Sequence, residues 1–377
     1  MNEDKSSRYH RLRRRAEVGG TAAAGLFLLI LMVSDAAHKL REGAAAVSMW
    51  QPFGIEEGLT VAVLMAALVI LLQIVEAPFA FYQGFVLEHR YGLSRQSRWQ
   101  WFKDQVKLTL VTLVLMVLGA SVVYYALRTW PGAWWAISAA LFTMAMVVLM
   151  QLAPVLLFPL FYTFRPLDRP VLVERLLALA GRARTHVAGV FEWVLSAHTR
   201  KANAALAGLG RTRRILLSDT LLADYSDDEI EVVMAHELAH HVHHDLWRGM
   251  ATQAASLAAG FFAADLLLRG AGDWAGLRGM ADPAGLPLLL LAAGAWSFLL
   301  MPLMNALSRL QERKADRYAL EATRNAEAFI TAMKRLSQQN LAEERPSPLV
   351  RWLFYSHPPI RERIDAARAF ASAVTPP

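Results

Sequence analysis

Long apolar stretches alternate with short polar and basic segments over the first 165 residues of the chain. A bilayer core is about 30 Å thick, so a helix needs about 20 apolar residues to cross it. Four runs approach or exceed this length: 18–37, 59–81, 108–126 and 133–158. The pattern predicts an N-terminal membrane domain over residues 1–165 with about four spans.

The pattern changes after residue 165, where charged and apolar positions mix as in a water-exposed α/β segment. Leucines and charged residues interleave over 172–183, which predicts a helix. Residues 187–195 and 214–217 favour strands, and 201–208 is expected to form an edge strand.

Two further apolar runs, 251–268 and 286–306, follow this segment. The first contains Gly260 and Asp265, so a buried amphipathic helix is an alternative to a membrane span there. If both runs cross, the chain has about six spans, and residues 166–377 form a second domain that includes two of them.

Composition supports a membrane protein. Hydrophobic residues make up 55% of the chain, charged residues 19%, and the mean hydropathy is +0.29. The net charge of +7 does not indicate a nucleic-acid partner, because the basic residues cluster beside the apolar runs. No feature of the composition indicates an oligomeric state.

The distribution of Lys and Arg predicts an orientation. Residues 10–15 and the loop over 90–107 are strongly basic, whereas the loop after the third run contains only Arg128. The positive-inside rule therefore places the N-terminus, the C-terminus and the segment after residue 165 on the cytosolic side. A bacterial inner membrane and a eukaryotic endomembrane both fit this pattern.

The chain contains no cysteine, so any metal site must be built from His, Asp and Glu. His236-Glu237-x-x-His240 supplies such a site, because residues four apart on a helix point the same way. Two imidazoles on one face can hold zinc, with Glu237 beside them to activate a water. Ser226 and Glu229 predict a capping box at the start of this helix.

A catalytic zinc usually takes three protein ligands. His241, His243 and His244 follow on the same helix, but one straight helix cannot wrap three such ligands around one ion. These histidines and Asp245 are instead expected to form an exposed polar helix end. Glu312 is the best third ligand. Asp316 lies four residues further on, so one of these carboxylates can bind metal while the other orients a ligand histidine.

Five ordered blocks resemble one family, the integral-membrane zinc metalloproteases typified by the type I CAAX prenyl protease. The blocks are FVLEHRYGLS at 85–94, Pro154 with Pro159, SDTLL at 218–222, the His236 motif with Glu312 and Asp316, and YSHPPIRER at 355–363. The resemblance covers most of the chain and begins near the first apolar run. It therefore favours a retained first span over the alternative of a cleaved signal peptide ending near Ser34.

The resemblance implies a mostly α polytopic membrane protein of about six spans with a zincin-like α/β metalloprotease domain that contains the His-Glu-x-x-His helix. It implies one Zn²⁺ per chain, bound by His236, His240 and Glu312, with Glu237 as the general base. Asp316 would orient one ligand histidine.

The resemblance also implies roles outside the ligand set. His357 and Arg363 would stabilise the tetrahedral intermediate, although His357 is alternatively a cap of the turn that the two prolines form. Asn203 and Ala204 resemble the start of the family's edge strand, which pairs with the substrate backbone. Physical reasoning assigns no role to residues 88–90.

The partners implied are a peptide or protein substrate, with or without a prenyl group, and membrane lipid. Relatives remove the last three residues of prenylated CAAX proteins, which favours C-terminal processing here. A quality-control protease that degrades misfolded membrane proteins is an alternative. A transporter or channel with a structural zinc is a third hypothesis, prompted by Glu76 and Asp265 within apolar runs.

Overall fold

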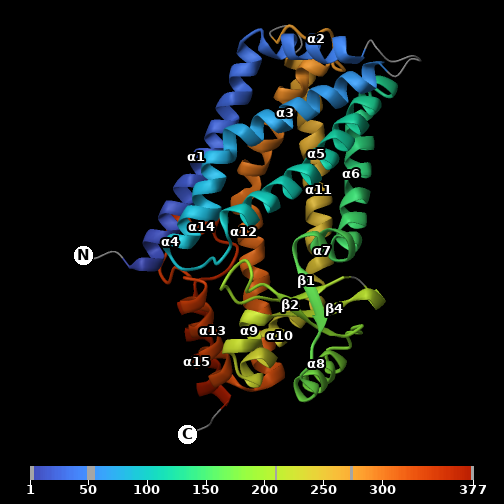
Figure 1. The fold of residues 1–377 in the computed structure, drawn as a ribbon. Coiled ribbons are helices and arrows are strands. Elements are labelled where there is room, and N and C mark those ends of the chain that lie inside the picture. The colour runs from blue at the N-terminus through green and yellow to red at the C-terminus, as the bar shows by residue number, and fades with distance from the viewer. Residues whose placement is uncertain (1–3, 49–55, 209, 272–274, 375–377) are drawn as a thin grey trace.

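The computed structural model describes residues 4–48, 56–208, 210–271 and 275–374. Helices dominate these residues, and the strands form one small sheet towards one end of the molecule (Figure 1). Residues up to 161 form α1 (Lys5–Val33), α2 (Ala36–Ser48), α3 (Glu56–Phe81), a π-helix (Tyr82–Leu87), α4 (Glu88–Arg90), α5 (Arg98–Thr129), α6 (Trp134–Leu152), a second π-helix (Ala153–Leu157) and α7 (Phe158–Phe161).

The rest of the chain contains the sheet and the other helices. Its elements are β1 (Thr163–Pro166), α8 (Pro170–Arg182), β2 (Val190–Val194), β3 (Ala204–Ala207), a 3₁₀ turn (Gly210–Thr212), β4 (Arg214–Ser218), α9 (Asp219–Asp224), α10 (Asp227–Val242), α11 (Asp245–Ala271), a 3₁₀ turn (Pro283–Gly285), α12 (Leu286–Thr323), α13 (Ala326–Gln339), α14 (Pro348–Phe354) and α15 (Ile360–Val374).

Six helical segments among the described residues are long and apolar enough to cross a membrane, as the sequence predicted. They are α1, α3 with the turns that continue it to Arg90, α5, α6, α11 and α12 with its preceding turn. Only 17% of the most apolar window of α11 is buried within the protein. A buried amphipathic helix over 251–268 is therefore not supported, because such a helix would be covered by protein on most sides.

The first span is an integral part of the fold. Helix α1 begins at Lys5, well before the predicted start at residue 18, and packs against α3 and α12. The early turns are polar in sequence, yet Tyr9 is only 1% exposed. Sequence hydropathy missed this half of the helix because protein contacts, rather than lipid, cover it. Helix α2 was also not predicted, and it lies across the far end of the spans (Figure 1).

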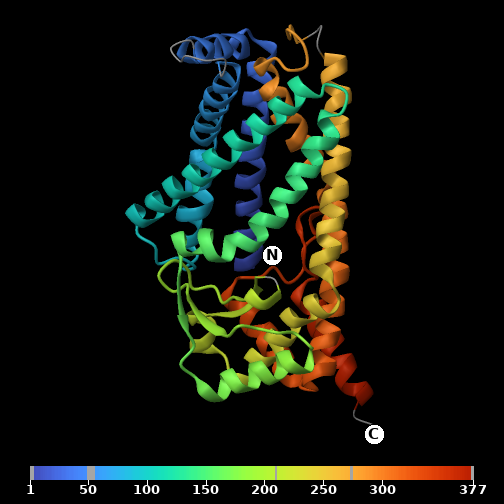
Figure 2. The ribbon, with the colours of Figure 1, turned by 90° about the vertical axis from the view of Figure 1, so that its right-hand side faces the viewer.

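Helices α11 and α12 pass side by side from the far end of the membrane domain to the sheet-containing end (Figure 2). Helix α12 was predicted to span over 286–306, but it continues unbroken for 38 residues to Thr323. The polar residues after 306 stay helical because they bury one face against α10. Glu312 and Asp316 thus lie on the same helix as a membrane span.

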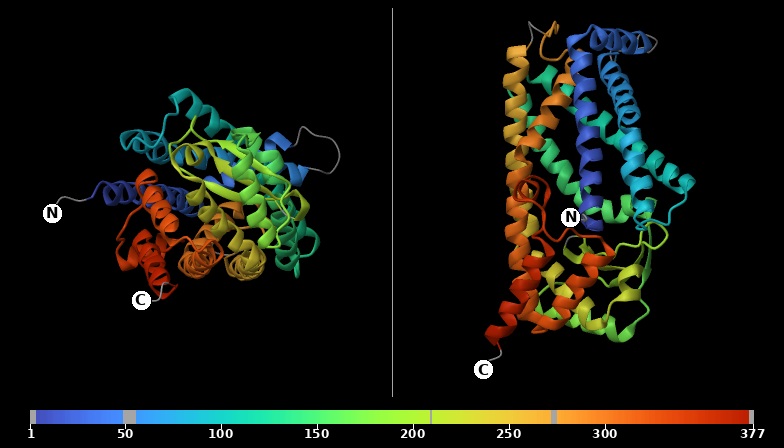
Figure 3. Two further views of the ribbon diagram at one scale, coloured as in Figure 1. Left: turned by 90° about the horizontal axis from the view of Figure 1, so that it is seen from below. Right: turned by 90° about the vertical axis from the view of Figure 1, so that its left-hand side faces the viewer.

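The sheet has the order β1-β2-β4-β3, with β2 and β4 parallel and the other two pairs antiparallel. Strands β2 and β3 lie within the predicted segments, β4 extends one residue beyond the predicted 214–217 to Ser218, and β1 was not predicted. Strand β3 is at one edge, as expected for 201–208, and its Ala204 pairs with Leu217. A buried apolar core joins this sheet to α8, α10, α13 and α15, which surround it at the lower end of the molecule (Figure 3).

Candidate metal centre and active site

Helix α10 begins with the capping box that the sequence predicted. The backbone N–H of Glu229 donates to the Ser226 hydroxyl at 3.3 Å, and the Ser226 N–H donates to the Glu229 carboxylate at 2.9 Å. Ile230, Met234 and Leu238 are fully buried in the apolar core. The start and the rotation of the helix are therefore fixed, which fixes the direction of its two motif histidines.

His236, His240 and Glu312 come together from α10 and α12. The Nε2 atom of His236 lies 3.3 Å from Oε2 of Glu312, and Nε2 of His240 lies 3.4 Å from Oε1. One ligand atom from each residue lies within 4.8 Å of the other two. Glu312 is 5% exposed, and its Oε2 atom has no hydrogen bond of acceptable geometry. A buried carboxylate oxygen facing two imidazoles fits a divalent metal such as zinc.

Asp316 contacts the first histidine. Its Oδ1 atom lies 2.9 Å from Nδ1 of His236, on the opposite side of the ring from Glu312. Arg363 of α15 in turn holds Asp316 with two hydrogen bonds, of 2.8 Å from Nε and 2.5 Å from Nη2. Arg363 is 9% exposed, and its Nη2 atom also lies 3.4 Å from Nδ1 of His236, so it contacts this histidine directly as well as through Asp316.

Asp245 contacts the second histidine, and the sequence did not predict this contact. Its Oδ2 atom lies 3.0 Å from Nδ1 of His240, and the residue is 7% exposed. The expectation that Asp245 belongs to an exposed helix end is therefore wrong. Helix α10 ends at Val242, His244 takes a left-handed conformation with φ of 57°, and α11 starts at Asp245. This tight turn brings Asp245 back beneath His240.

The other histidines after the motif are not in the ligand group. His241 has its Nε2 atom 3.4 Å from the Arg213 guanidinium, and His243 packs edge-on against the Tyr318 ring. The neighbouring Arg313 pairs with Glu362 rather than with Glu312.

His357 reaches the same centre from the segment between α14 and α15. Its Nδ1 atom lies 2.8 Å from Oε2 of Glu312, and its side chain is 61% exposed. The Arg309 guanidinium of α12 donates to the backbone carbonyls of Arg351 and Tyr355 and thereby holds this segment in place. His357 is thus a partly solvent-facing imidazole at the edge of the candidate metal site.

Burial and charge set the protonation of the α10 residues. Burial raises the pKa of the Glu237 carboxyl, which favours proton uptake by this group. Burial alone would lower the pKa of His236, but the contacts with Asp316 and Glu312 raise it to about 9. Burial alone would also lower the pKa of His240, but the contact with Glu312 opposes this, and the pKa of His240 is raised overall.

Strand β3 lies beside these residues. Helix α10 packs against it, and β3 pairs only with β4 among the described strands. Asn203 precedes the strand and is exposed, and Ala204 is its first residue. The free edge of β3 can accept an extended peptide by backbone hydrogen bonding.

Family models match both parts of the chain. The model described as peptidase family M48 matches residues 166–371. The model described as CAAX prenyl protease N-terminal, five membrane helices, matches residues 2–163. In this chain, four of the long apolar helical segments and the shorter α2 lie within the second match.

Curated relatives and a solved structure are similar to the chain. The uncharacterized metalloprotease YhfN of Bacillus subtilis is 34% identical over 75% of this chain and 68% of its own length. The CAAX prenyl protease 1 homolog of Arabidopsis thaliana is 30% identical over 78% of this chain and 70% of its own length. The crystal structure of S. mikatae Ste24p has a TM-score of 0.84 at 21% identity and covers 96% of this chain and 88% of that one.

Proposed function

The chain belongs to peptidase family M48, and from this premise we propose that it is a zinc endopeptidase that processes the C-termini of prenylated CAAX-type proteins or peptides. It is an integral membrane metallopeptidase. The observation on which the proposal rests is the convergence of His236, His240 and Glu312 beside Glu237. A transporter with a structural zinc gives no reason for a buried carboxylate next to a complete ligand set.

His236, His240 and Glu312 would hold the ion. When bound, zinc supplies a Lewis acid that polarises the scissile carbonyl and makes a nearby water more acidic. Glu237 takes the proton from the attacking water and passes it to the leaving amine. The raised pKa of this buried carboxyl suits both halves of the transfer, because the carboxylate accepts the proton of the water readily and holds it until the leaving nitrogen takes it.

His357 would donate a hydrogen bond to the oxyanion that develops on the scissile carbonyl. Arg363, which the resemblance placed near the same centre, lies behind Asp316 in the structure. We therefore propose that Arg363 acts by fixing Asp316 with two hydrogen bonds and by contacting Nδ1 of His236. Asn203 and Ala204 would align the substrate backbone along the free edge of β3.

A prenyl group or a lipid chain needs an apolar environment. A cavity of about 450 Å³ lies within the membrane domain between α5, α6, α11 and α12, and its lining is mostly aliphatic and aromatic. This cavity supports the proposal that the substrate includes a prenyl chain.

The first residues of α1 and the metal centre belong to the same end of the molecule, since Tyr9 lies close to Glu88 and Lys201 (Figures 1 and 3). We propose that this end is cytosolic, because residues 10–15 and the loop over 90–107 are strongly basic. The chain ends themselves, 1–3 and 375–377, lie outside the described residues. The division into domains 1–165 and 166–377 stays a prediction.

The test is cleavage of a farnesylated CAAX peptide by the purified protein in detergent, with Glu237→Gln as the matched inactive variant. We expect products three residues shorter than the substrate from the wild type, and none from the variant at equal metal content. An unprenylated, unfolded membrane protein is assayed in parallel. Cleavage of only the unfolded protein would move the function to quality control, and cleavage of neither would overturn the peptidase proposal.

A further inference from the structure

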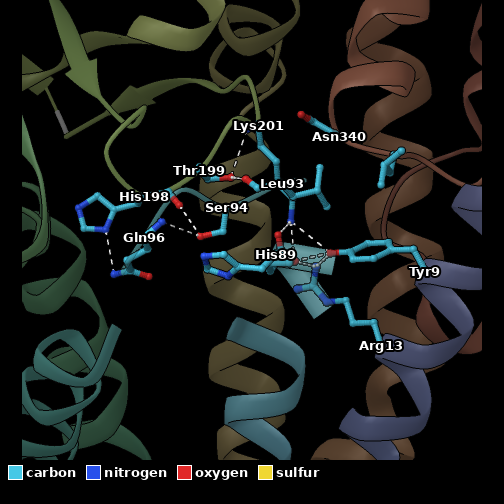
Figure 4. Close-up of polar contacts among 12 residues, drawn as sticks. Tyr9, Arg13, His89, Leu93, Ser94, Gln96, His198, Thr199, Lys201 and Asn340 are labelled. Atoms are coloured by element: carbon cyan, nitrogen blue, oxygen red, sulfur yellow. Dashed lines mark hydrogen bonds and ion pairs between the residues drawn. The ribbon is translucent and has the colours of Figure 1, made fainter. Parts of the chain in front are cut away.

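The segment that leads into the edge strand β3 is held from outside the sheet. Residues 198–200 run beside the loop between α4 and α5 of the membrane domain. The Arg200 N–H donates to the Leu93 carbonyl at 2.8 Å, and Ser94 forms an antiparallel bridge with Thr199. The Ser94 hydroxyl also donates to the His198 carbonyl at 2.9 Å. The loop of the membrane domain therefore pairs by backbone and side-chain hydrogen bonds with the chain a few residues before β3 (Figure 4).

The next residue, Lys201, extends its side chain to Glu88. Its ammonium lies 3.0 Å from both carboxylate oxygens and donates to the Tyr9 hydroxyl at 3.3 Å. Tyr9 donates to the same carboxylate, and Arg13 donates to Tyr9 at 3.1 Å (Figure 4). One carboxylate from the FVLEHRYGLS block thus joins α1 to the start of β3.

Apolar side chains enclose this contact. Tyr9, Leu87 and Leu93 form a separate buried cluster at the junction of the two parts of the molecule. The Glu88 side chain is 13% exposed and that of Lys201 is 27% exposed. Burial lowers the pKa of Lys201 and the Glu88 charge opposes this, so removal of Glu88 leaves a poorly solvated cation.

The two residues after Lys201 are fixed as well. The side-chain amide of Asn340 accepts from the Ala202 N–H at 3.0 Å and donates to the Ala202 carbonyl at 3.2 Å. The Asn203 N–H donates to the Ser218 hydroxyl at 2.9 Å. The approach to β3 is therefore held at three successive residues, and Lys201 is the one among them that is tied to the membrane domain.

From this geometry we infer that Glu88 and Lys201 are positioning residues that set the place and register of the free edge of β3, on which the substrate backbone docks. The inference rests on the proposed function. It also gives a role to residue 88, which sequence reasoning could not explain. Neither residue contacts the metal ligands in the contacts described above, so the pair acts on peptide alignment rather than on metal binding.

The test is a set of variants made in the full-length protein and assayed with the farnesylated CAAX peptide. We expect Lys201→Met and Glu88→Gln each to raise KM by about tenfold while kcat stays within about twofold, because strand pairing supplies substrate affinity. The double variant should lose little more than either single variant, since both remove the same contact. Lys201→Arg keeps the charge and should stay close to wild type.

Two readouts separate positioning from a general loss of structure. Metal content should be unchanged, and hydrogen exchange should increase over 199–207 but not over α10. Arg41→Met is the matched control, because Arg41 forms a 2.9 Å buried pair with Asp282 near α2, at the other end of the spans. It should leave KM unchanged.

Wild-type KM in both Lys201→Met and Glu88→Gln would overturn the inference, as would equal KM increases in these variants and in Arg41→Met. No cleavage by the wild type would instead be a failure of the proposed function. Loss of metal in the variants would show that the pair supports the centre itself and would also overturn the inference.

Discussion

The Oδ1 atom of Asp316 lies 2.9 Å from Nδ1 of His236, so the other ring nitrogen is left to face Glu312. The carboxylate therefore selects the tautomer that binds metal through Nε2. We expect Asp316→Asn to weaken zinc binding by about 10- to 100-fold, measured by competition with a chelator. Asp365→Asn, at an exposed position of α15, should bind zinc as the wild type does. Equal affinities for Asp316→Asn and wild type would contradict this role.

Asp245 has the same relationship to His240 but comes from the start of a different helix. Asp245→Asn should weaken zinc binding by about 10- to 100-fold as well. Asp228→Asn is the matched control, because Asp228 is also an acidic residue in the first turn of a helix but pairs with Arg175. If both variants keep wild-type affinity, the contact between Asp245 and His240 does not orient a ligand.

His357 reaches the centre on an exposed side chain, which suits contact with substrate. We expect His357→Ala to lower kcat by about 10²-fold while KM and zinc content stay near wild type, since a lost oxyanion donor acts on the transition state. Steady-state kinetics and metal analysis give the answer. A normal kcat would support the alternative that His357 only caps its turn.

Zinc affinity should depend on pH because a proton competes with the metal for His236. The pKa of this group is raised from 6.5 to about 9 in the folded chain. In protein stripped of metal, its contribution to stability is therefore complete below pH 6.5 and is lost as pH rises through about 9.

The affinity for zinc should instead increase as the pH rises, because the metal requires the neutral imidazole. The apparent affinity should increase by at least about tenfold per pH unit, because His236 releases one proton and the raised pKa of His240 adds to the effect, and it should level off near pH 9. Titrations across this range in chelator buffers measure the slope. A flat profile between neutral pH and 9 would show that His236 is already neutral before zinc binds.

The absence of cysteine allows a direct test of sidedness with single introduced thiols. Glu42 in α2 and Arg317 in α12 have exposed side chains, and five of the long apolar helices separate them along the chain, counting α12 itself. In right-side-out vesicles, an impermeant maleimide should label Glu42→Cys at once and Arg317→Cys only after permeabilisation. The reverse order would invert the proposed orientation, and labelling of both without permeabilisation would contradict the span count.

Periodicity and motif spacing predicted the parts of the site that lie within one element. The α10 capping box and the pair of histidines are local features. The two histidines lie together with Glu312 as expected. The apolar runs likewise gave the six long segments, since lipid exposure is read directly from hydropathy.

Features that depend on tertiary contact were missed. Asp245 looked like an exposed helix end because nothing in the sequence shows that the chain reverses at His244. The first turns of α1 and the end of α12 are polar, yet both stay helical because other helices cover them. Strand β1 is short and mostly exposed, so it has no alternating apolar pattern to detect.

The unbroken course of α12 fixes the distance along the helix between its membrane-spanning part and Glu312. From Leu286 to Glu312 the helix rises by about 39 Å at 1.5 Å per residue, whereas the hydrocarbon core is about 30 Å thick. With Leu286 at one boundary of the hydrocarbon core and α12 along the membrane normal, Glu312 lies about 9 Å beyond the opposite boundary. For a lipid-modified substrate of the kind proposed above, the number of residues between the modified residue and a peptide bond would then decide which bond reaches Glu312.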